Sequence, residues 1–103
     1  MDRIEQIKAF LNESPEDCFL KHALALEYIK TGEYVKARQY FETNRHQDPQ
    51  YIATYYHLGQ LLEKMELPKE ALVIYEEGMK RAKEAGDQHA FSELRSVYDE
   101  LLF

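Results

Sequence analysis

The stretch YYHLGQLLEKMELPKEALVIYEEG, from Tyr55 to Gly78, contains two helical patterns that meet at Pro68. Proline is tolerated at the first position of a helix but not in its interior, so a second helix is expected to begin there. Gly59 nevertheless lies inside the first pattern, where glycine costs about 1 kcal/mol relative to alanine. A compensating interaction is therefore expected at Gly59.

The same residue types recur 34 positions apart along the chain. The repeat pairs Leu24 with Leu58, Ala25 with Gly59, Tyr28 with Leu62, Ala37 with Ala71, and Phe41 with Tyr75. A third copy follows at a spacing of 36, because two residues are inserted near 84–87. It pairs Phe91 with Tyr55, Leu94 with Leu58, and Tyr98 with Leu62.

No stretch alternates apolar and polar residues with the period of a strand, and the chain is predicted to be all-α. Six helices are expected near 2–13, 16–30, 33–46, 49–65, 68–84 and 87–102. Pro15, Pro49 and Pro68 are expected at first helical positions. Gly32 and Gly86 are expected to end helices, with Asp87 capping the last one.

The second copy best shows the pattern of a known family: Tyr55, Leu58, Gly59, Leu62, Ala71 and Tyr75. This pattern resembles the tetratricopeptide repeat. The resemblance implies a short α-solenoid of about six antiparallel helices in a right-handed superhelix, serving as a scaffold for protein binding. Lys21 departs from the pattern, which usually has a large aromatic residue there, and so does Asn44, where a small residue is usual.

The resemblance divides residues 1–103, as a single domain, into a capping helix (2–13), two repeats (18–51 and 52–85) and a partial third repeat that forms a second cap (87–103). Each repeat is expected to be a pair of antiparallel helices. Gly59 and Ala71 would then be small so that the two backbones approach closely, with Tyr75 beside them. Alanine, present as Ala25 in the first copy, is expected to be tolerated at Gly59, but a large side chain is not.

Composition limits the function. The 103 residues carry 13 basic and 19 acidic side chains, a net charge of −6, which opposes binding to nucleic acid. There is no apolar run long enough for a membrane helix and no secretory signal, so a cytoplasmic protein without membrane contact is expected. Neither the four histidines nor the single Cys18 has the spacing of a metal or catalytic site. No enzyme activity, metal or cofactor is predicted.

A second stripe, offset from the packing stripe, remains on each inner helix. In the family it resembles, this stripe lines a concave groove that binds a peptide or helix of another protein. The candidate groove residues are Phe19, His22, Leu26, Ile29, Lys30, Tyr56, Gln60, Glu63, Lys64, Ser92, Ser96 and Asp99. The expected ligand is a short amphipathic segment, and protonated His22 and His57 would favour an acidic flank near pH 6.

Some relatives in that family grip the terminal carboxylate of chaperone peptides with Lys, Asn and Arg side chains. The matching positions here are His22, Leu26, His57, His89 and Glu93. None of them is Lys, Asn or Arg, and Glu93 has the wrong sign, so that specialised function is rejected at neutral pH. Two hypotheses remain. One is an adaptor that binds a partner in the groove. The other is a protein that self-associates through its apolar terminal helices, with a homodimer as the expected form.

Overall fold

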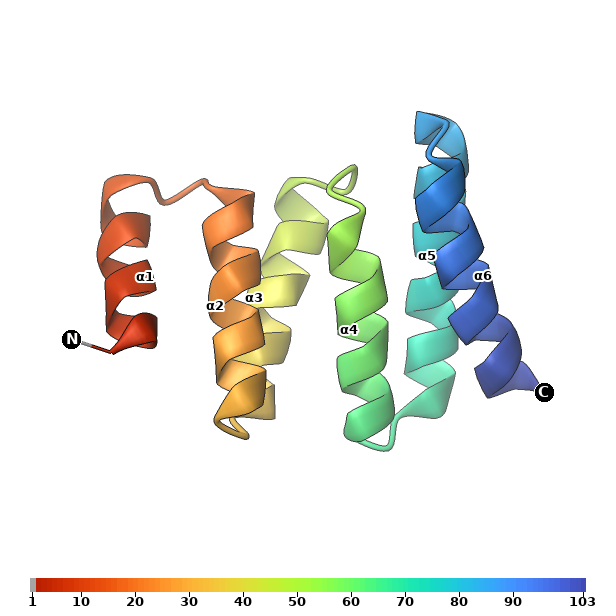
Figure 1. Ribbon diagram of the computed structural model, residues 1–103, viewed down its shortest axis with the longest axis horizontal. Coiled ribbons are helices and arrows are strands. Elements are labelled where there is room, and N and C mark those ends of the chain that lie inside the picture. Colours follow the sequence, from red (N-terminus) through yellow and green to blue (C-terminus); the bar gives the residue numbers. More distant parts are fainter. Residues whose placement is uncertain (1) are drawn as a thin grey trace. The chain divides into compact units, whose positions relative to one another are not determined.

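The computed structural model describes residues 2–103, which form six α-helices and no β-strand. The helices are α1 (Arg3–Glu13), α2 (Cys18–Lys30), α3 (Tyr34–Gln47), α4 (Ala53–Lys64), α5 (Pro68–Ala85) and α6 (Gln88–Leu102) (Figure 1). The all-α fold class predicted from the sequence is confirmed.

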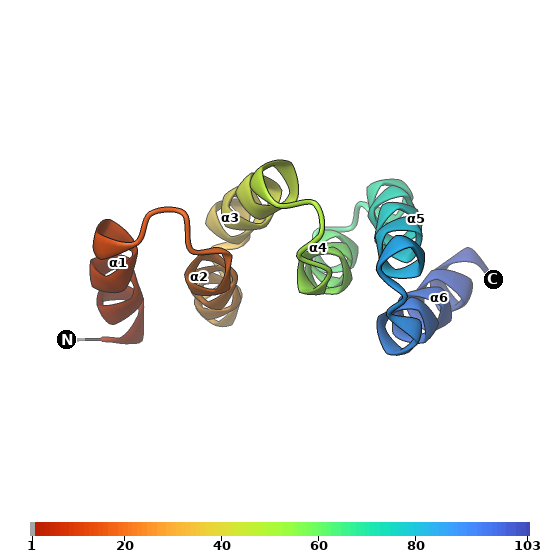
Figure 2. The same cartoon turned by 90° about the horizontal axis from the view of Figure 1, so that it is seen from above.

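The helices belong to two compact units, one ending at Asp48 and the other spanning Pro49–Phe103. In the first unit, α2 packs against both α1 and α3. In the second unit, α5 packs against both α4 and α6 (Figure 2), and α6 also contacts α4. The division into a capping helix, two repeats and a partial third repeat stays a prediction.

The predicted helix ends at the glycines are confirmed. Gly32 has φ +78° after α2, and Gly86 has φ +70° after α5, both in the left-handed region that glycine adopts without strain. At the start of α6, the Asp87 side chain accepts a hydrogen bond from the Ala90 amide at 3.0 Å. This bond satisfies one of the free amides of the first turn, as an N-cap does.

The prediction for two of the three prolines is wrong. Only Pro68 lies in the first turn of its helix, whereas Pro15 and Pro49 lie in turns before α2 and α4. Helix α2 begins later because Asp17 caps it, accepting from the Leu20 amide at 3.0 Å. The Pro49 carbonyl is engaged elsewhere, since it accepts a hydrogen bond from the Tyr55 hydroxyl at 2.6 Å.

The close approach predicted at Gly59 is present between α4 and α5. Gly59 is buried, and Ala71 and Tyr75 are fully buried opposite it. A Cβ added to Gly59 would lie within 3.0 Å of three atoms of the Tyr75 ring. The tolerance of alanine expected there is therefore incorrect, because the ring would have to move. Dispersion between the Tyr75 ring and the backbone of α4 offsets the free-energy cost of a glycine inside the helix.

A second glycine, Gly78, explains the two departures from the repeat pattern. A Cβ on Gly78 would lie within 3.0 Å of the Tyr55 Cβ, so the bulky tyrosine requires glycine opposite it. In the first unit, Lys21 replaces that tyrosine and Asn44 replaces that glycine. Lys21 donates to Gln47, and the Asn44 amide donates to the Cys18 carbonyl at 3.0 Å. Both members of the tyrosine–glycine pair are thus replaced in the first unit.

Glu66 is the one described residue other than glycine with a positive φ, at +62°. It occupies the position of Gly32 in the 34-residue register. The backbone bonds match as well. The amide after each residue donates to the carbonyl five positions earlier, Glu33 to Tyr28 and Leu67 to Leu62, both at 2.9 Å. The turn after α4 therefore has the same backbone conformation as the turn after α2, but glutamate takes the place of glycine.

Replacing this glutamate should stabilise the protein. A left-handed residue with a Cβ is strained by about 1 kcal/mol, and Glu66→Gly removes that strain. We expect the midpoint of thermal unfolding to rise by several degrees, measured by circular dichroism. The reciprocal Gly32→Glu, at a position with no atom within 4 Å of an added Cβ, should lower it. An unchanged or lower midpoint in Glu66→Gly would show that the backbone at Glu66 is not strained.

Alanine at Gly59 should destabilise the protein although it favours helix. Overpacking in a core costs about 1–3 kcal/mol, against about 1 kcal/mol gained in helix propensity. We expect a lower free energy of unfolding for Gly59→Ala in urea denaturation, and a larger loss for Gly59→Leu. Lys69→Ala, on the exposed side of α5, is the control and should change little. A stabilised Gly59→Ala variant would contradict the close approach.

Candidate binding cleft

A cleft of about 430 Å³ lies between α4 and α6 in the second unit. Its lining residues are Tyr56, Gln60, Glu63, Glu93, Ser96, Val97 and Glu100. A second hollow of about 220 Å³ lies beside it and shares Tyr56 and Glu93. Tyr56 therefore stands between two adjacent depressions, and its half-buried ring is accessible from both.

A buried hydroxyl positions the polar side chains of the cleft. The Tyr75 hydroxyl of α5 donates to the Glu63 carboxylate at 2.5 Å and accepts from the Gln60 amide at 2.6 Å. Burial, followed by the bond to Glu63, raises the pKa of Tyr75 above its ordinary value. The residue that packs on Gly59 in the core thus fixes the orientation of two residues that line the cleft.

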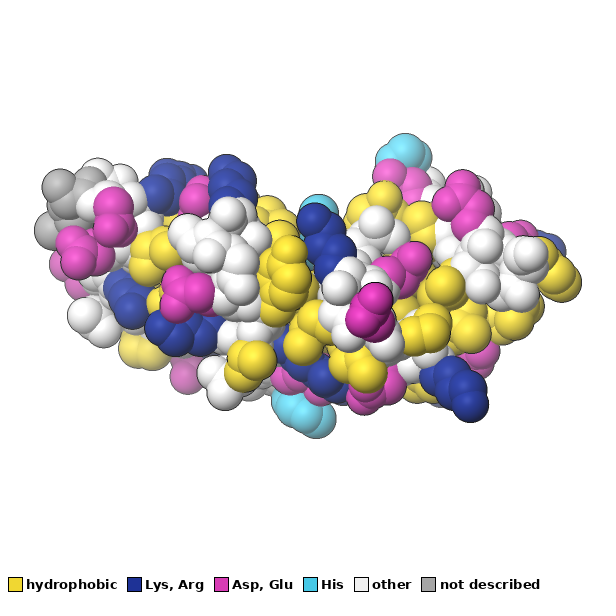
Figure 3. Space-filling view, turned by 90° about the horizontal axis from the view of Figure 1, so that it is seen from below, with side chains coloured by type: hydrophobic (Ala, Val, Ile, Leu, Met, Phe, Trp, Pro, Cys, Tyr) yellow, Lys and Arg dark blue, Asp and Glu magenta, His cyan; other side chains and the backbone are white. Residues whose placement is uncertain are grey.

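The cleft is acidic. Three glutamates line it, Glu63 from α4 and Glu93 and Glu100 from α6, whereas no lysine or arginine does. Figure 3 shows acidic side chains among hydrophobic ones toward the C-terminal end of the chain. Carboxylates on opposing helices attract a cationic ligand. Tyr56 and Val97 supply apolar contact in the same cleft.

The histidine beside Tyr56 contradicts the expected preference for an acidic ligand at pH 6. The rings of Tyr56 and His57 meet edge to face, with centroids 5.4 Å apart. Burial lowers the pKa of His57, although the Glu93 charge opposes that effect. Desolvation disfavours the charged imidazolium, so His57 stays neutral further into the acid range than a free histidine. The glutamates, rather than this histidine, set the charge of the cleft.

The predicted groove residues of the second unit separate into three groups. Tyr56, Gln60, Glu63 and Ser96 line the cleft together. Lys64 and Ser92 are exposed outside it. Asp99 lies in a different hollow, between α5 and α6, and pairs with Arg95 at 3.7 Å. Their assignment to one groove stays a prediction.

The predicted groove residues of the first unit differ in exposure. Phe19 is 67% exposed, Leu26 and Ile29 are half-buried, and Lys30 is exposed and pairs with Glu27 at 3.3 Å. His22 is only 8% exposed, and its ring meets the buried Phe41 edge-on at 5.5 Å. Phe19 is the large apolar side chain of this set that is most open to a ligand.

Sequence reasoning missed the apolar and acidic wall that α6 contributes. Glu93, Val97 and Glu100 are spaced by four and three residues, which places them on one helix face. That spacing was a usable signal. The acidic character of the cleft was not readable, however, because Glu63 comes from another helix and only the fold brings it opposite α6.

The Cys18 thiol has a raised pKa, whereas a reactive thiol has a lowered one. Burial, followed by the nearby Asp48 carboxylate, raises the pKa of Cys18, and its sulfur lies 3.8 Å from an Asp48 oxygen. A place at the start of a helix lowers the pKa of a thiol, but burial and the Asp48 charge outweigh that effect on Cys18. Among residues 2–103, no cluster of three His, Cys, Asp or Glu side chains could hold a metal ion. No helix in this range combines the length and apolarity needed to cross a bilayer.

Comparison with solved structures identifies the family. The solution structure of a tetratricopeptide repeat domain protein from Salinibacter ruber superposes with a TM-score of 0.82. It is 38% identical, and the match covers 84% of this chain and 88% of that one. The chain belongs to the tetratricopeptide repeat family. No family model matches it, and no curated protein matches it.

The tetratricopeptide fold also appears in more distant structures. A protein from Bordetella parapertussis has a TM-score of 0.84 at 22% identity, covering 99% of this chain and 89% of that one. SycD, a type III secretion translocator chaperone from Yersinia enterocolitica, has a TM-score of 0.83 at 12% identity, covering 95% and 68%. At these identities the similarity concerns the fold alone.

The raised pKa of Tyr75 should make the protein sensitive to alkali. An unfolded tyrosine ionises near pH 10, so the stability that the protonated hydroxyl contributes is present below about pH 10 and lost above it. We expect the free energy of unfolding to fall between pH 9 and pH 11, and to fall less steeply in Tyr75→Phe. Tyr34→Phe, outside the network, is the control. Identical slopes for wild type and Tyr75→Phe would exclude this role.

Proposed function

We propose that this tetratricopeptide repeat protein is an interaction module that binds a short basic, amphipathic segment of a partner protein in the cleft between α4 and α6. The observation that carries the proposal is the position of Tyr56 among the three glutamates of the cleft. Tyrosine supplies a large contact area with little rotational freedom to lose, and it is enriched at interface hot spots. The proposed role requires no catalysis, metal or cofactor.

The geometry supports both parts of the ligand. An apolar side chain would pack on the ring of Tyr56 and beside Val97. A lysine or arginine three or four residues away would reach Glu93 or Glu63, whose carboxylate is oriented by Tyr75 and Gln60. Preorganised polar groups reduce the ordering cost of binding. Among the fold relatives, SycD is named as a chaperone of a translocator protein, which is in keeping with a protein ligand.

A second candidate function is self-association through the end of α6. Leu102 is 47% exposed and Phe103 is 96% exposed. Large apolar side chains open to water favour contact with another apolar surface. Sedimentation velocity at micromolar concentration separates this candidate from the first. A dimer that dissociates in the Leu102→Ser, Phe103→Ser double variant would support it.

The cleft proposal is tested with defined peptides. Selection from a displayed library of 12-residue peptides should enrich sequences that combine an apolar anchor with lysine or arginine. For the best labelled peptide, Tyr56→Ala should weaken binding by about 1–2 kcal/mol in a fluorescence anisotropy titration. Glu93→Gln should weaken it by less than about 1 kcal/mol, and the loss should shrink in high salt because the contact is exposed.

Two controls are matched to these variants. Gln39→Ala shortens a side chain on the exposed side of α3. Glu16→Gln removes an exposed carboxylate outside the cleft. Both should leave the dissociation constant within about twofold of wild type. Enrichment of acidic peptides, or equal effects of Glu16→Gln and Glu93→Gln, would reject the cleft as the binding site.

A further inference from the structure

The face of α6 that corresponds to the packing face of α4 is only partly covered by the helices of residues 2–103. Leu94 is buried beside Gly78 of α5, and the Tyr98 hydroxyl donates to Glu76 of α5 at 3.0 Å. In the 36-residue register, Phe91 and Tyr98 of α6 take the places of Tyr55 and Leu62 of α4. On α4, both of those residues are buried where α5 packs. On α6, Phe91 and Tyr98 are only half-buried. The same face is thus fully covered in one copy and partly open in the next.

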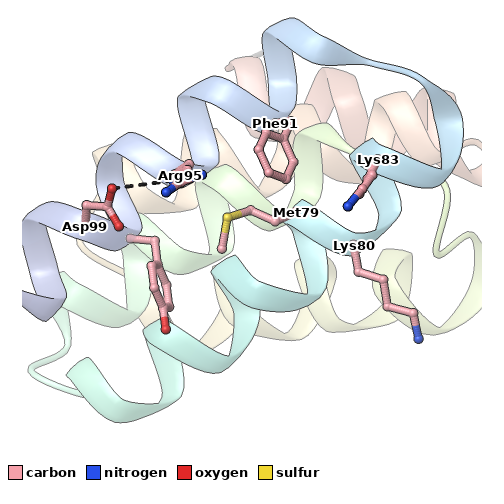
Figure 4. Close-up of a pocket in the computed structure, with 7 residues that line it drawn as sticks. Met79, Lys80, Lys83, Phe91, Arg95 and Asp99 are labelled. Carbon is pink, nitrogen blue, oxygen red and sulfur yellow. Dashed lines mark ion pairs between the residues drawn. The ribbon is translucent and has the colours of Figure 1, made fainter.

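The open face borders a hollow of about 360 Å³ between α5 and α6, which we term the α5–α6 slot. Its lining residues are Met79, Lys80, Lys83, Phe91, Arg95, Tyr98 and Asp99. Figure 4 shows Met79 and Phe91 close together in the middle of the slot, with Lys80 and Lys83 along the α5 side. The slot therefore has an apolar floor and a cationic rim.

Arg95 occupies the position that corresponds to Gly59, the glycine that lets α4 and α5 pack closely in the preceding copy. On α4, Gly59 receives the ring of Tyr75. Arg95 occupies the matching position on α6, and Asp99, which matches Glu63, pairs with it at 3.7 Å. A tyrosine from an incoming helix would meet a guanidinium instead of bare backbone. A carboxylate at that position would instead form a charge-assisted hydrogen bond with Arg95.

The charge of the slot is unusual for this protein. The chain carries a net charge of −6, yet Lys80, Lys83 and Arg95 surround the slot with Asp99 as its one acidic lining residue. The nearby Glu76 is engaged by the Tyr98 hydroxyl, which donates to it at 3.0 Å. A cationic patch of this kind favours an acidic segment of a partner over a neutral or basic one.

We propose that the α5–α6 slot is a second docking site, which binds an acidic amphipathic helix of a partner protein. The helix would lie on α6 as α5 lies on α4. It would carry an acidic residue where α5 has Tyr75, to meet Arg95, and a small residue where α5 has Gly78, to clear Phe91. This site lies on a different side of α6 from the acidic cleft and has the opposite charge preference.

The probe is a synthetic peptide with the sequence of α5, residues 68–85, acetylated and amidated at its ends. One version carries Tyr75→Glu and the other Tyr75→Lys. In fluorescence anisotropy titrations with the whole protein, the Glu peptide should bind at least about tenfold more tightly than the Lys peptide. The Arg95→Glu variant of the protein should reverse this preference. A misfolded variant would lose binding to both peptides. A reversed preference therefore indicates that the peptide residue contacts position 95.

Two further measurements fix the site and the occupant. Tyr56→Ala should leave the dissociation constant of the Glu peptide unchanged, because Tyr56 lines the cleft and not the slot. The two proposals can therefore fail independently of each other. The proposal is overturned if neither peptide binds at 1 mM protein, or if Arg95→Glu does not reverse the preference. It is also overturned if sedimentation velocity shows a dimer that Arg95→Glu dissociates, because the slot would then bind a second copy.

Discussion

The ring of Tyr75 lies against the backbone of Gly59, and the second unit is organised around this contact. Because Gly59 has no side chain, α4 and α5 approach closely enough to bury Tyr75 completely. The buried hydroxyl of the same ring binds Gln60 and Glu63, two residues of α4 that line the cleft. One aromatic side chain therefore links the packing of the helix pair to the arrangement of the cleft. A substitution that moves the ring should disturb both.

The two sides of α6 illustrate how a repeat can be reused with different chemistry. Toward α4, α6 contributes Glu93 and Glu100 to an acidic cleft that contains Tyr56. Toward α5, it contributes Arg95 and half-buried aromatic rings to a slot with a cationic rim. In the register of the repeat, Arg95 takes the place of Gly59, so a packing position has become a charged one. Phe91, Leu94 and Tyr98 keep the apolar pattern, while Arg95 and residues outside the pattern set the charge of each face.

The fold was largely predictable because its determinants are local in sequence. Gly32, Gly86 and the Asp87 cap each act within one helix or turn, and they were read correctly. The 34-residue register adds the spacing of each helix pair, which is also visible along the chain. Pro15 and Pro49 were misread because Asp17 supplies a better cap and Tyr55 binds the Pro49 carbonyl. The site was less predictable. Tyr56, Gln60, Glu63 and Ser96 were named, but the acidity of the cleft depends on which residues of α4 and α6 face each other. The exchange of Tyr55 and Gly78 for Lys21 and Asn44 likewise requires the packed structure.

A double-mutant cycle between positions 59 and 75 tests the central contact most directly. The free energy of unfolding is measured for wild type, Gly59→Ala, Tyr75→Leu and the double variant by urea denaturation. If the Tyr75 ring is what excludes a Cβ at position 59, alanine there should cost much less when leucine replaces the tyrosine. We expect a coupling energy of about 1 kcal/mol or more, as found for residues in contact. Additive effects within about 0.3 kcal/mol would contradict the close approach on which this account rests.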